Sequence, residues 1–404
     1  MNNRYTGKYL VKPGKSPEIH RAGWIIVNPW HVIENGSIAT ADGRIQDIVK
    51  AGPGCSLKPG CIDHGPGVLM APLVNAHTHL ELSYFKGRVD MSRGFKAWVK
   101  DLLELREKTS PEIIMSEACR AGQELYNSGV LWAGEVSTTG VTKEIFQNSS
   151  LYGVWFQEFL GSENSLQNNL SLENKYLVHG KDISFSLAGH APHTTSPDLL
   201  KKNKKRTDKK KLPFSIHVSE SMEEMEFIRT CKGRWAQFLK SRSIDFSSWN
   251  LPEKSPVIHL MNLGLLDPLT LLVHVLNVND RDLKIIAESG AKVCVCPRSN
   301  MGLHGTLPEL EKMFNHGIRP ALGTDSLASS ESLSIFDEMK FISENYRDME
   351  PCQILAMATQ YGADVLGAGS ETGSLEPGKR SDMLYIPCIA ETEKEVMKKI
   401  TGHG

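Results

Sequence analysis

The sequence predicts an α/β fold: a (β/α)8 barrel, or TIM barrel, joined to a small β-sandwich built from both termini. Apolar runs of strand length alternate with helical stretches eight times through the middle of the 404-residue chain. Short β-rich runs separated by turn residues occupy both of its ends. We expect residues 1–70 and 368–404 to form the sandwich domain and residues 71–367 to form the barrel domain.

The β-rich runs near the start of the chain are separated by hairpin-type turns. Asn35-Gly and Asp42-Gly are dipeptides typical of two-residue hairpin turns. Near the other end, a turn that begins at Gly373 precedes a strand-like run that ends at Pro387. Strands from both termini can complete one small domain when the two ends of a barrel lie close together. The early runs are 24–28, 37–40 and 44–49.

Eight candidate strands in the middle of the chain are each followed by helical sequence, which is the count for a (β/α)8 barrel. The candidate strands are 68–75, 129–136, 151–159, 183–189, 213–218, 270–275, 291–296 and 318–323. The clearest helical stretches are 94–107, 111–126, 220–240 and 332–344. A basic run at 201–211 has no interleaved aromatic residues, so we interpret it as a solvated helix end rather than a nucleic-acid site.

Composition and charge argue against several classes of protein. The formal net charge is −1, so no overall field favours nucleic acid or an anionic membrane. No apolar run has the length of a membrane span, and the first residues lack the pattern of a signal peptide. Cys294 and Cys296 lie in a β-rich run, without a second cysteine pair at zinc-finger spacing. We therefore expect reduced, buried cysteines in a cytoplasmic protein with neither nucleic-acid nor membrane partners.

Two histidines, His77 and His79, end the first apolar run of the expected barrel. Side chains alternate between the faces of a strand, so both imidazoles point the same way, about 6–7 Å apart along it. That separation allows them to share one metal ion at the end of a barrel strand that carries the chemistry. His-x-His alone is a weak signal, because two histidines can end a strand without binding anything.

Further candidate residues end other strands of the expected barrel. His217 ends strand five, Glu220 follows it by three residues, His274 lies in strand six and Asp325 follows strand eight. Each has a structural alternative: His274 as a hydrogen-bonded core residue, Glu220 as a carboxylate favoured by a helix N-terminus, and Asp325 as a helix cap. In a barrel, however, these strand ends surround one point, and so many imidazoles and carboxylates there predict a metal-dependent catalytic site.

The constellation resembles the amidohydrolase superfamily over nearly the whole chain. The motifs are His77-Thr-His79, His217-Val-Ser-Glu220, His274 and Gly323-Thr-Asp-Ser326. The segments 189–197, 296–300 and 373–378 are similar to those of its deaminase and chlorohydrolase (ATZ/TRZ-like) branch. The run His77 to Ser83 is similar to that of aminodeoxyfutalosine deaminases, which act in the futalosine route to menaquinone.

The resemblance implies one divalent ion per chain, held by His77, His79, His217 and Asp325. Members with two ions bridge them with a carboxylated lysine or a glutamate near the end of strand four, and residues 182–190 offer neither there. Nitrogen and carboxylate ligands suit Zn²⁺, with Fe²⁺ as the alternative. Relatives commonly form homodimers, which makes a homodimer the candidate assembly.

We expect catalytic roles for Glu220, His274 and Asp325. A bound ion would lower the pKa of a water molecule toward roughly 7. Glu220 would take a proton from that water and pass it to the substrate ring nitrogen and the leaving amine. His274 would orient the water and stabilise growing negative charge, and Asp325 would accept a proton.

Three further residues are candidate substrate contacts. The resemblance makes His190 a contact, with a ribose hydroxyl as one candidate group, while His193 nearby and Glu81 after the histidine pair are candidates from their positions. A structural role is the alternative for each. Phe95 and Trp98 either wall the pocket or pack in the core.

Three functions are compatible with these residues. The first is a deaminase of an aminopurine-type nucleoside, with an aminodeoxyfutalosine-like small molecule as substrate and ammonia as product. The second is another reaction of the same branch, on S-adenosylhomocysteine, adenosine, guanine, cytosine or a chlorotriazine. The third is a non-catalytic scaffold, which the full set of metal ligands disfavours.

Overall fold

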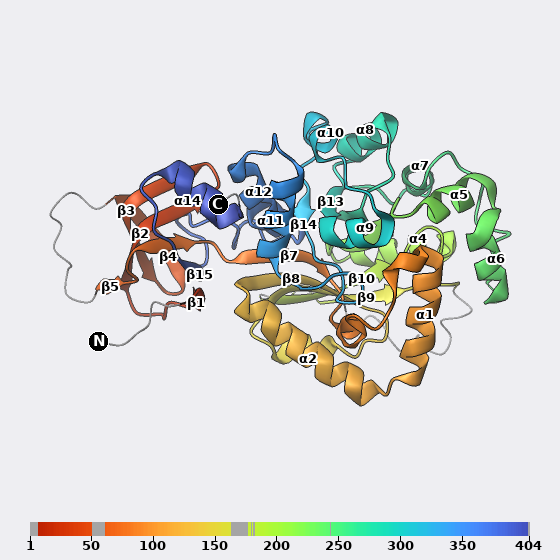
Figure 1. The fold of residues 1–404 in the computed structure, drawn as a ribbon, viewed down its shortest axis with the longest axis horizontal. Coiled ribbons are helices and arrows are strands. Elements are labelled where there is room, and N and C mark those ends of the chain that lie inside the picture. Colours follow the sequence, from red (N-terminus) through yellow and green to blue (C-terminus); the bar gives the residue numbers. More distant parts are fainter. Residues whose placement is uncertain are drawn as a thin grey trace. The chain divides into compact units, whose positions relative to one another are not determined.

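The computed structural model describes residues 7–50, 61–162, 177–178, 180, 182–242 and 244–402. It confirms the predicted fold class, with an eight-stranded parallel barrel and a separate β-sandwich domain made from both termini (Figure 1). The described chain divides into two compact units. One holds the described residues up to Asn75, Glu124–Trp132 and everything from Ser334 on, and the other holds Ala76–Gln123 and Ala133–Leu333. The domain boundaries expected from the sequence, 1–70 with 368–404 against 71–367, stay a prediction.

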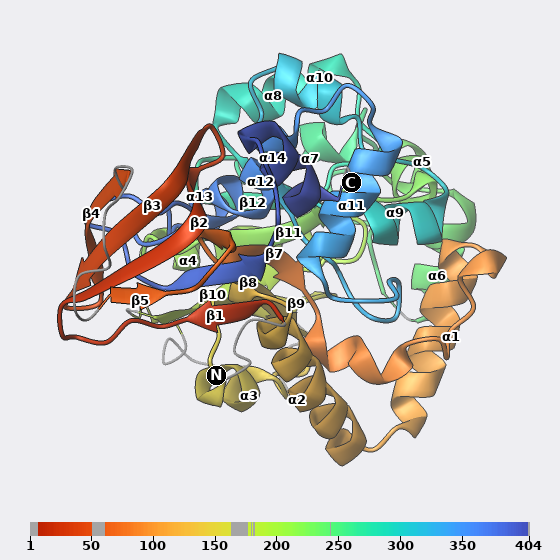
Figure 2. The ribbon, with the colours of Figure 1, turned by 60° about the vertical axis from the view of Figure 1, so that its left-hand side comes forward.

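The sandwich domain is one sheet with strand order β1-β15-β6-β2-β3-β4, and β5 pairs with β2. Figure 2 shows β2 and β3 as long adjoining strands, which pair antiparallel. Buried Ile25, Ile38, Leu69 and Tyr385 form its core, so strands from both ends of the sequence share one apolar centre. The strands are β1 (Tyr9–Val11), β2 (Glu18–Asn28), β3 (His31–Ala41), β4 (Arg44–Lys50), β5 (Cys61–Asp63), β6 (Gly67–Met70) and β15 (Met383–Pro387).

The barrel strands follow one another in chain order, each parallel to the next. A parallel bridge between Thr78 and Asp325 joins the first strand to the segment after the last. The strands are β7 (Leu73–Thr78), β8 (Val130–Ser137), β9 (Tyr152–Phe159), β10 (Ile183–Gly189), β11 (Phe214–Val218), β12 (Thr270–His274), β13 (Lys292–Val295) and β14 (Ala321–Leu322). All eight match candidate strands, but the candidate at 68–75 was wrong as one element. It divides at Pro72, which has no N–H for a sheet, into β6 of the sandwich and β7 of the barrel.

Helices follow the strands as predicted, with one division. The stretch 220–240 forms two helices, because Cys231 adopts a left-handed conformation (φ 53°) and Gly233 follows it (φ 87°). The helices are η1 (Leu80–Phe85), η2 (Met91–Arg93), α1 (Phe95–Lys108), α2 (Pro111–Asn127), α3 (Lys143–Asn148), α4 (Pro197–Asp208), α5 (Met222–Thr230), α6 (Gly233–Ser241), α7 (Pro256–Asn262), α8 (Asp280–Ser289), α9 (Pro297–His304), α10 (Leu310–Asn315), α11 (Ile335–Asn345), α12 (Pro351–Ala358), α13 (Gln360–Val365) and α14 (Glu393–Thr401).

Three smaller predictions have structural outcomes. The basic run 201–211 forms much of α4 and the turn after it, as expected of a helix end. Cys294 and Cys296 are fully buried, as expected. Among the described residues, no helix combines the length and apolarity that a membrane crossing needs.

Candidate active site

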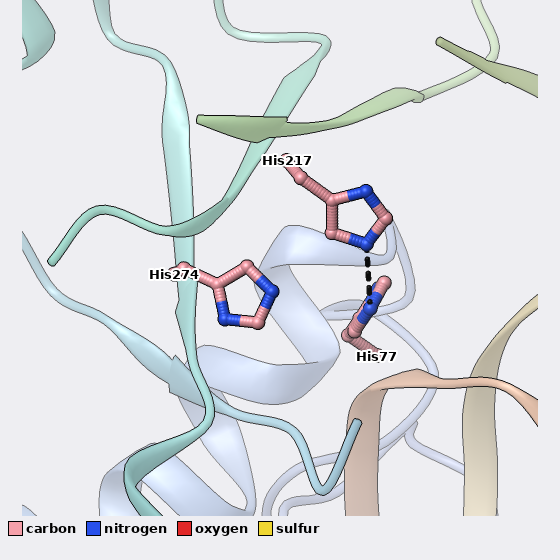
Figure 3. A group of neighbouring side chains, drawn as sticks. All are labelled: His77, His217 and His274. Atoms are coloured by element: carbon pink, nitrogen blue, oxygen red, sulfur yellow. Dashed lines mark hydrogen bonds between the residues drawn. The ribbon is translucent and has the colours of Figure 1, made fainter. Parts of the chain in front are cut away.

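Three imidazoles and one carboxylate from three segments converge on one point at the C-terminal ends of the barrel strands. Nε2 of His217 lies 3.1 Å from Nε2 of His77 and 3.4 Å from Nε2 of His79. Figure 3 shows His77 and His217 facing each other, with His274 beside them. Oδ1 of Asp325 lies 3.8 Å from Nε2 of each of His77 and His79. We call His77, His79, His217 and Asp325 the ligand cluster. All four belong to the second compact unit.

The spacing of the ligand cluster fits a single metal ion. Zn²⁺ binds imidazole nitrogen at about 2.0–2.1 Å, so adjacent atoms of a tetrahedral ligand set lie about 3.3–3.4 Å apart. The observed separations between ligand atoms, from 3.1 to 3.8 Å, lie on either side of that value. Two groups of buried residues each have ligand atoms within 4.8 Å of one another. One is His77, His79 and Asp325, and the other is His79, His217 and Glu158. The four residues therefore have both the donor types and the spacing that a divalent ion requires.

Hydrogen bonds fix which atom His217 and Asp325 each direct toward the centre of the ligand cluster. Nδ1 of His217 lies 2.7 Å from the backbone oxygen of His190. A carbonyl only accepts, so Nδ1 carries the hydrogen and Nε2 keeps a lone pair toward the cluster. Oδ2 of Asp325 accepts from the hydroxyls of Ser299 (2.6 Å) and Ser329 (2.7 Å), which leaves Oδ1 facing the histidines.

Burial also prepares these imidazoles to bind an ion. It lowers the pKa of His77 and of His217 well below the usual range, and neighbouring imidazoles lower both further. The neutral ring is the form that binds metals. His274 and Asp325 have left-handed backbone conformations, with φ of 74° and 56°. Such conformations are costly for residues other than glycine, and they are concentrated at functional sites.

Glu220 lies beside the cluster, between two further imidazoles. Its Oε1 is 3.3 Å from Nε2 of His304 and 3.7 Å from Nε2 of His274. Burial raises the pKa of Glu220, but His274 and His304 lower it by more, so the net shift is downward and the carboxylate is ionised. Glu224 accepts hydrogen bonds from the backbone N–H groups of Ser219 (3.0 Å) and Glu220 (2.8 Å). These bonds fix the turn that carries Glu220.

His274 is oriented by Asn300, a residue of α9. The side-chain amide Nδ2 of Asn300 donates to Nδ1 of His274 over 3.1 Å. In the neutral ring Nε2 then carries the hydrogen, and this N–H is directed toward the space beside Glu220. The arrangement pairs a hydrogen-bond acceptor, Glu220, with a donor, His274.

A cavity brings these groups together with an apolar wall. Phe95 and Trp98 are both lining residues and members of the buried apolar cluster, so the two roles considered for them coexist. The polar residues that line the cavity are His79, Arg106, Thr138, Glu158, His190, Thr194, His217, Glu220, Arg242, His274, Asp325 and Ser326.

The candidate substrate contacts occupy different positions. His190 lines the cavity, and its Nδ1 lies 2.7 Å from the hydroxyl of Thr194. Burial, then His193, lowers the pKa of His190 to about 3. His193 itself is buried against Trp235, with ring centroids 4.9 Å apart, and is not among the lining residues.

Glu81 lies in η1 and is buried against the C-terminal end of β8. Both of its carboxylate oxygens already accept hydrogen bonds there. Its donors are the hydroxyls of Ser137 (2.5 Å) and Thr139 (2.6 Å), the backbone N–H groups of Thr138 (3.1 Å) and Thr139 (3.2 Å), and Arg106 (3.1 Å). Burial raises its pKa, but Arg106 and these hydrogen bonds lower it by more. A substrate donor would have to displace one of these groups. The direct contacts proposed for Glu81 and His193 stay predictions.

The family follows from a match across the barrel. Residues 68–399 match the model of the amidohydrolase family. The chain belongs to the amidohydrolase family. Members are metal-dependent, in agreement with the geometry of the ligand cluster, and the relatives of the chain include several deaminases. This amidohydrolase is accordingly a hydrolytic enzyme of the deaminase class, acting on carbon–nitrogen bonds.

Three comparisons describe the similarity of this amidohydrolase. The 5-methylthioadenosine/S-adenosylhomocysteine deaminase of Symbiobacterium thermophilum is 30% identical over 387 residues, 88% of this chain and 81% of that protein. The structure of Helicobacter pylori aminofutalosine deaminase with methylthio-coformycin has a TM-score of 0.84 and 25% identity, and covers 96% of both chains. A zinc-bound adenosine deaminase from Xanthomonas campestris shares the fold, with a TM-score of 0.78 and 20% identity over 96% and 90% of the chains.

Sequence reasoning missed several residues of the amidohydrolase site. Glu158 is the residue before the last of β9 and lines the cavity, so its position near the end of a barrel strand is a usable signal. His304, at the end of α9, contacts Glu220, which no spacing in the sequence indicates. Asn300 on α9 and Arg106 on α1 belong to helices, where no strand-end position marks them as residues of the site.

Proposed function

We propose that this amidohydrolase removes the exocyclic amine of an adenosine-type nucleoside by hydrolysis, with aminodeoxyfutalosine as its substrate. The observation that carries the deaminase chemistry is the pairing of Glu220 with His274 beside the ligand cluster. The choice of nucleoside is supported by relatives that act on adenosine derivatives and by the likeness to aminofutalosine deaminase over 96% of both chains. Such an activity would place the enzyme in menaquinone biosynthesis by the futalosine route.

The proposed cofactor is one Zn²⁺ per chain, with Fe²⁺ as the alternative. His77, His79, His217 and Asp325 would hold the ion. When bound, the ion would supply Lewis acidity and lower the pKa of a water molecule in the site. The cytoplasmic location and the homodimer expected from the sequence also stay predictions.

The protein residues then divide the work of proton transfer. Glu220, ionised and buried, accepts one proton from the attacking water and delivers it to the ring nitrogen next to the reacting carbon, where it stays in the product. The Nε2–H of His274 donates to the oxygen on which negative charge develops. Asp325, held by two serine hydroxyls, would accept the second proton of the water and pass it to the exocyclic amine, which then leaves as ammonia.

A second candidate is deamination of 5-methylthioadenosine or S-adenosylhomocysteine. The relative from Symbiobacterium thermophilum, at 30% identity over 88% of this chain, favours it. Both candidates require an adenine ring on a ribose, and they differ in the group at the 5′ carbon.

An ammonia-release assay on the metal-loaded protein tests the proposal. The substrates are aminodeoxyfutalosine, 5-methylthioadenosine, S-adenosylhomocysteine, adenosine, guanine, cytosine and a chlorotriazine. We expect ammonia and the corresponding inosine-type product in equal amounts, with aminodeoxyfutalosine converted fastest. Fastest conversion of 5-methylthioadenosine or S-adenosylhomocysteine selects the second candidate, and chloride release or base deamination alone rejects both.

A further inference from the structure

Glu158 is a buried carboxylate in the catalytic cavity that the proposed proton transfers do not use. It lies near the end of β9, is 4% exposed and lines the same cavity as His190 and Glu220. Its Oε2 accepts from the hydroxyl of Thr138 over 2.7 Å. Its Oε1 has no hydrogen-bond partner among the described residues. A buried carboxylate oxygen without a donor is costly, so a ligand that supplies a donor would remove that cost.

Oε1 of Glu158 does not serve to orient the ring of His217. Oε1 lies 3.7 Å from Nδ1 of His217, which is too long for a hydrogen bond. The hydrogen on Nδ1 is already donated to the backbone oxygen of His190 over 2.7 Å. Oε1 also lies on the Nδ1 side of the ring, whereas Nε2 faces the ligand cluster. The oxygen is therefore not hydrogen-bonded to His217, although a carboxylate oxygen of Glu158 lies within 4.8 Å of ligand atoms of His79 and His217.

The hydrogen-bonding groups of an adenosine-type nucleoside limit what Glu158 can bind. The uncharged purine ring nitrogens are acceptors, and an ionised carboxylate is an acceptor only. The exocyclic amine is a donor, but it must lie at the ligand cluster to be replaced. The remaining donors common to these nucleosides are the ribose hydroxyls.

We propose that Glu158 is a specificity-determining residue whose Oε1 accepts hydrogen bonds from the 2′,3′-diol of the substrate ribose. This inference rests on the proposed function, because it takes the substrate to be an adenosine-type nucleoside. It assigns to Glu158 a substrate contact of the kind for which Glu81 is a candidate from its position in the sequence.

Glu81 is connected to Glu158, the proposed diol-binding residue, through Thr138. It accepts from the backbone N–H of Thr138, and the hydroxyl of Thr138 donates to Glu158. Arg106 neutralises Glu81 at 3.1 Å. Through this chain of contacts, Glu81 acts as a positioning residue for Thr138 and Glu158.

The test combines a conservative variant with removal of the diol. The kcat/KM values of wild type and Glu158→Gln are measured for aminodeoxyfutalosine and adenosine, each beside its 2′,3′-dideoxy counterpart. Exposed Glu144, on α3, supplies the matched control Glu144→Gln. A hydrogen bond to a charged group contributes about 1.5–3 kcal/mol, or about 10–100-fold. We expect Glu158→Gln to lose that factor with the diol-bearing substrates and less than about threefold with the dideoxy analogues, and Glu144→Gln to lose nothing with either.

Several outcomes overturn the inference. Equal losses on diol and dideoxy substrates would show that Glu158 does not contact the diol, although the nucleoside deaminase function would stand. A loss of bound metal in Glu158→Gln, measured by elemental analysis, would make Glu158 a metal ligand instead. Wild-type enzyme that deaminates none of the nucleosides would reject the proposed function, and this inference with it.

Discussion

Oε1 of Glu220 lies 3.3 Å from Nε2 of His304, which follows it by 84 residues in the chain. Together with His274 at 3.7 Å, this second imidazole keeps Glu220 ionised despite its burial. An ionised carboxylate beside the ligand cluster is the form that a general base requires.

Glu220→Gln should therefore retain the metal and lose turnover. The amide keeps the size of the side chain but cannot accept a proton, and general acid–base groups contribute roughly 10²–10⁴-fold. The measurement is kcat together with metal content, with exposed Glu226→Gln on α5 as the matched control. Activity of Glu220→Gln within about tenfold of wild type would remove Glu220 from the mechanism.

Asn300→Leu should lower kcat by about tenfold without loss of metal. The amide of Asn300 fixes the tautomer of His274, and leucine has a similar size but no donor. The free ring would distribute between two tautomers and rotate more freely. Steady-state kinetics with the best nucleoside substrate measure this effect, and an unchanged kcat would show that His274 needs no support from α9.

One divalent ion per chain is expected after purification or reconstitution. The ligand cluster accounts for one ion, and the end of β10 carries neither lysine nor glutamate as a bridge. Elemental analysis should give about one Zn²⁺ or Fe²⁺, and a chelator should abolish activity reversibly. Two ions that persist through exchange would contradict the mononuclear site, with Glu158, His79 and His217 as the first residues to examine.

Acid should destabilise the sandwich domain through His64. Burial, then His20, lowers the pKa of His64 to about 4, against 6.5 normally. The folded state thus favours the neutral ring, so the stabilisation is complete above pH 6.5 and is lost as pH falls from 6.5 to 4. Denaturant unfolding of wild type and His64→Gln should show a shallower loss of unfolding free energy in the variant, with exposed His31→Gln as control. Parallel pH profiles for wild type and His64→Gln would refute this.

Residues on the barrel strands and at their ends were predictable from the sequence, whereas most contacts between the connecting segments were not. His77, His79, His217, His274 and Asp325 end apolar runs, and a parallel barrel brings such ends together whatever the loops do. The division at Pro72 was also readable, because a proline seldom occupies the interior of a strand.

Local geometry decided what the sequence could not show. Glu81 follows His79 by two residues, and the 3-10 turn η1 directs it to the segment after β8, a contact that its position in the sequence does not indicate. Asn300 and His304 meet the site because α9 follows β13 at a particular angle, which depends on packing between residues far apart in sequence. The role proposed for Glu158 rests on an unpaired oxygen in the cavity, which the sequence does not show even though the strand-end position does.

The most direct test of the account is the ratio of kcat/KM between nucleosides and free bases. In the proposed mechanism Glu220 and His274 act at the reacting carbon, so selectivity must come from binding energy elsewhere in the substrate. The values for aminodeoxyfutalosine, adenosine, S-adenosylhomocysteine, adenine, guanine and cytosine are measured under one condition with the metal-loaded enzyme. The account predicts that aminodeoxyfutalosine exceeds adenine by at least about 10²-fold. A free base that exceeds every nucleoside by about tenfold or more would contradict it.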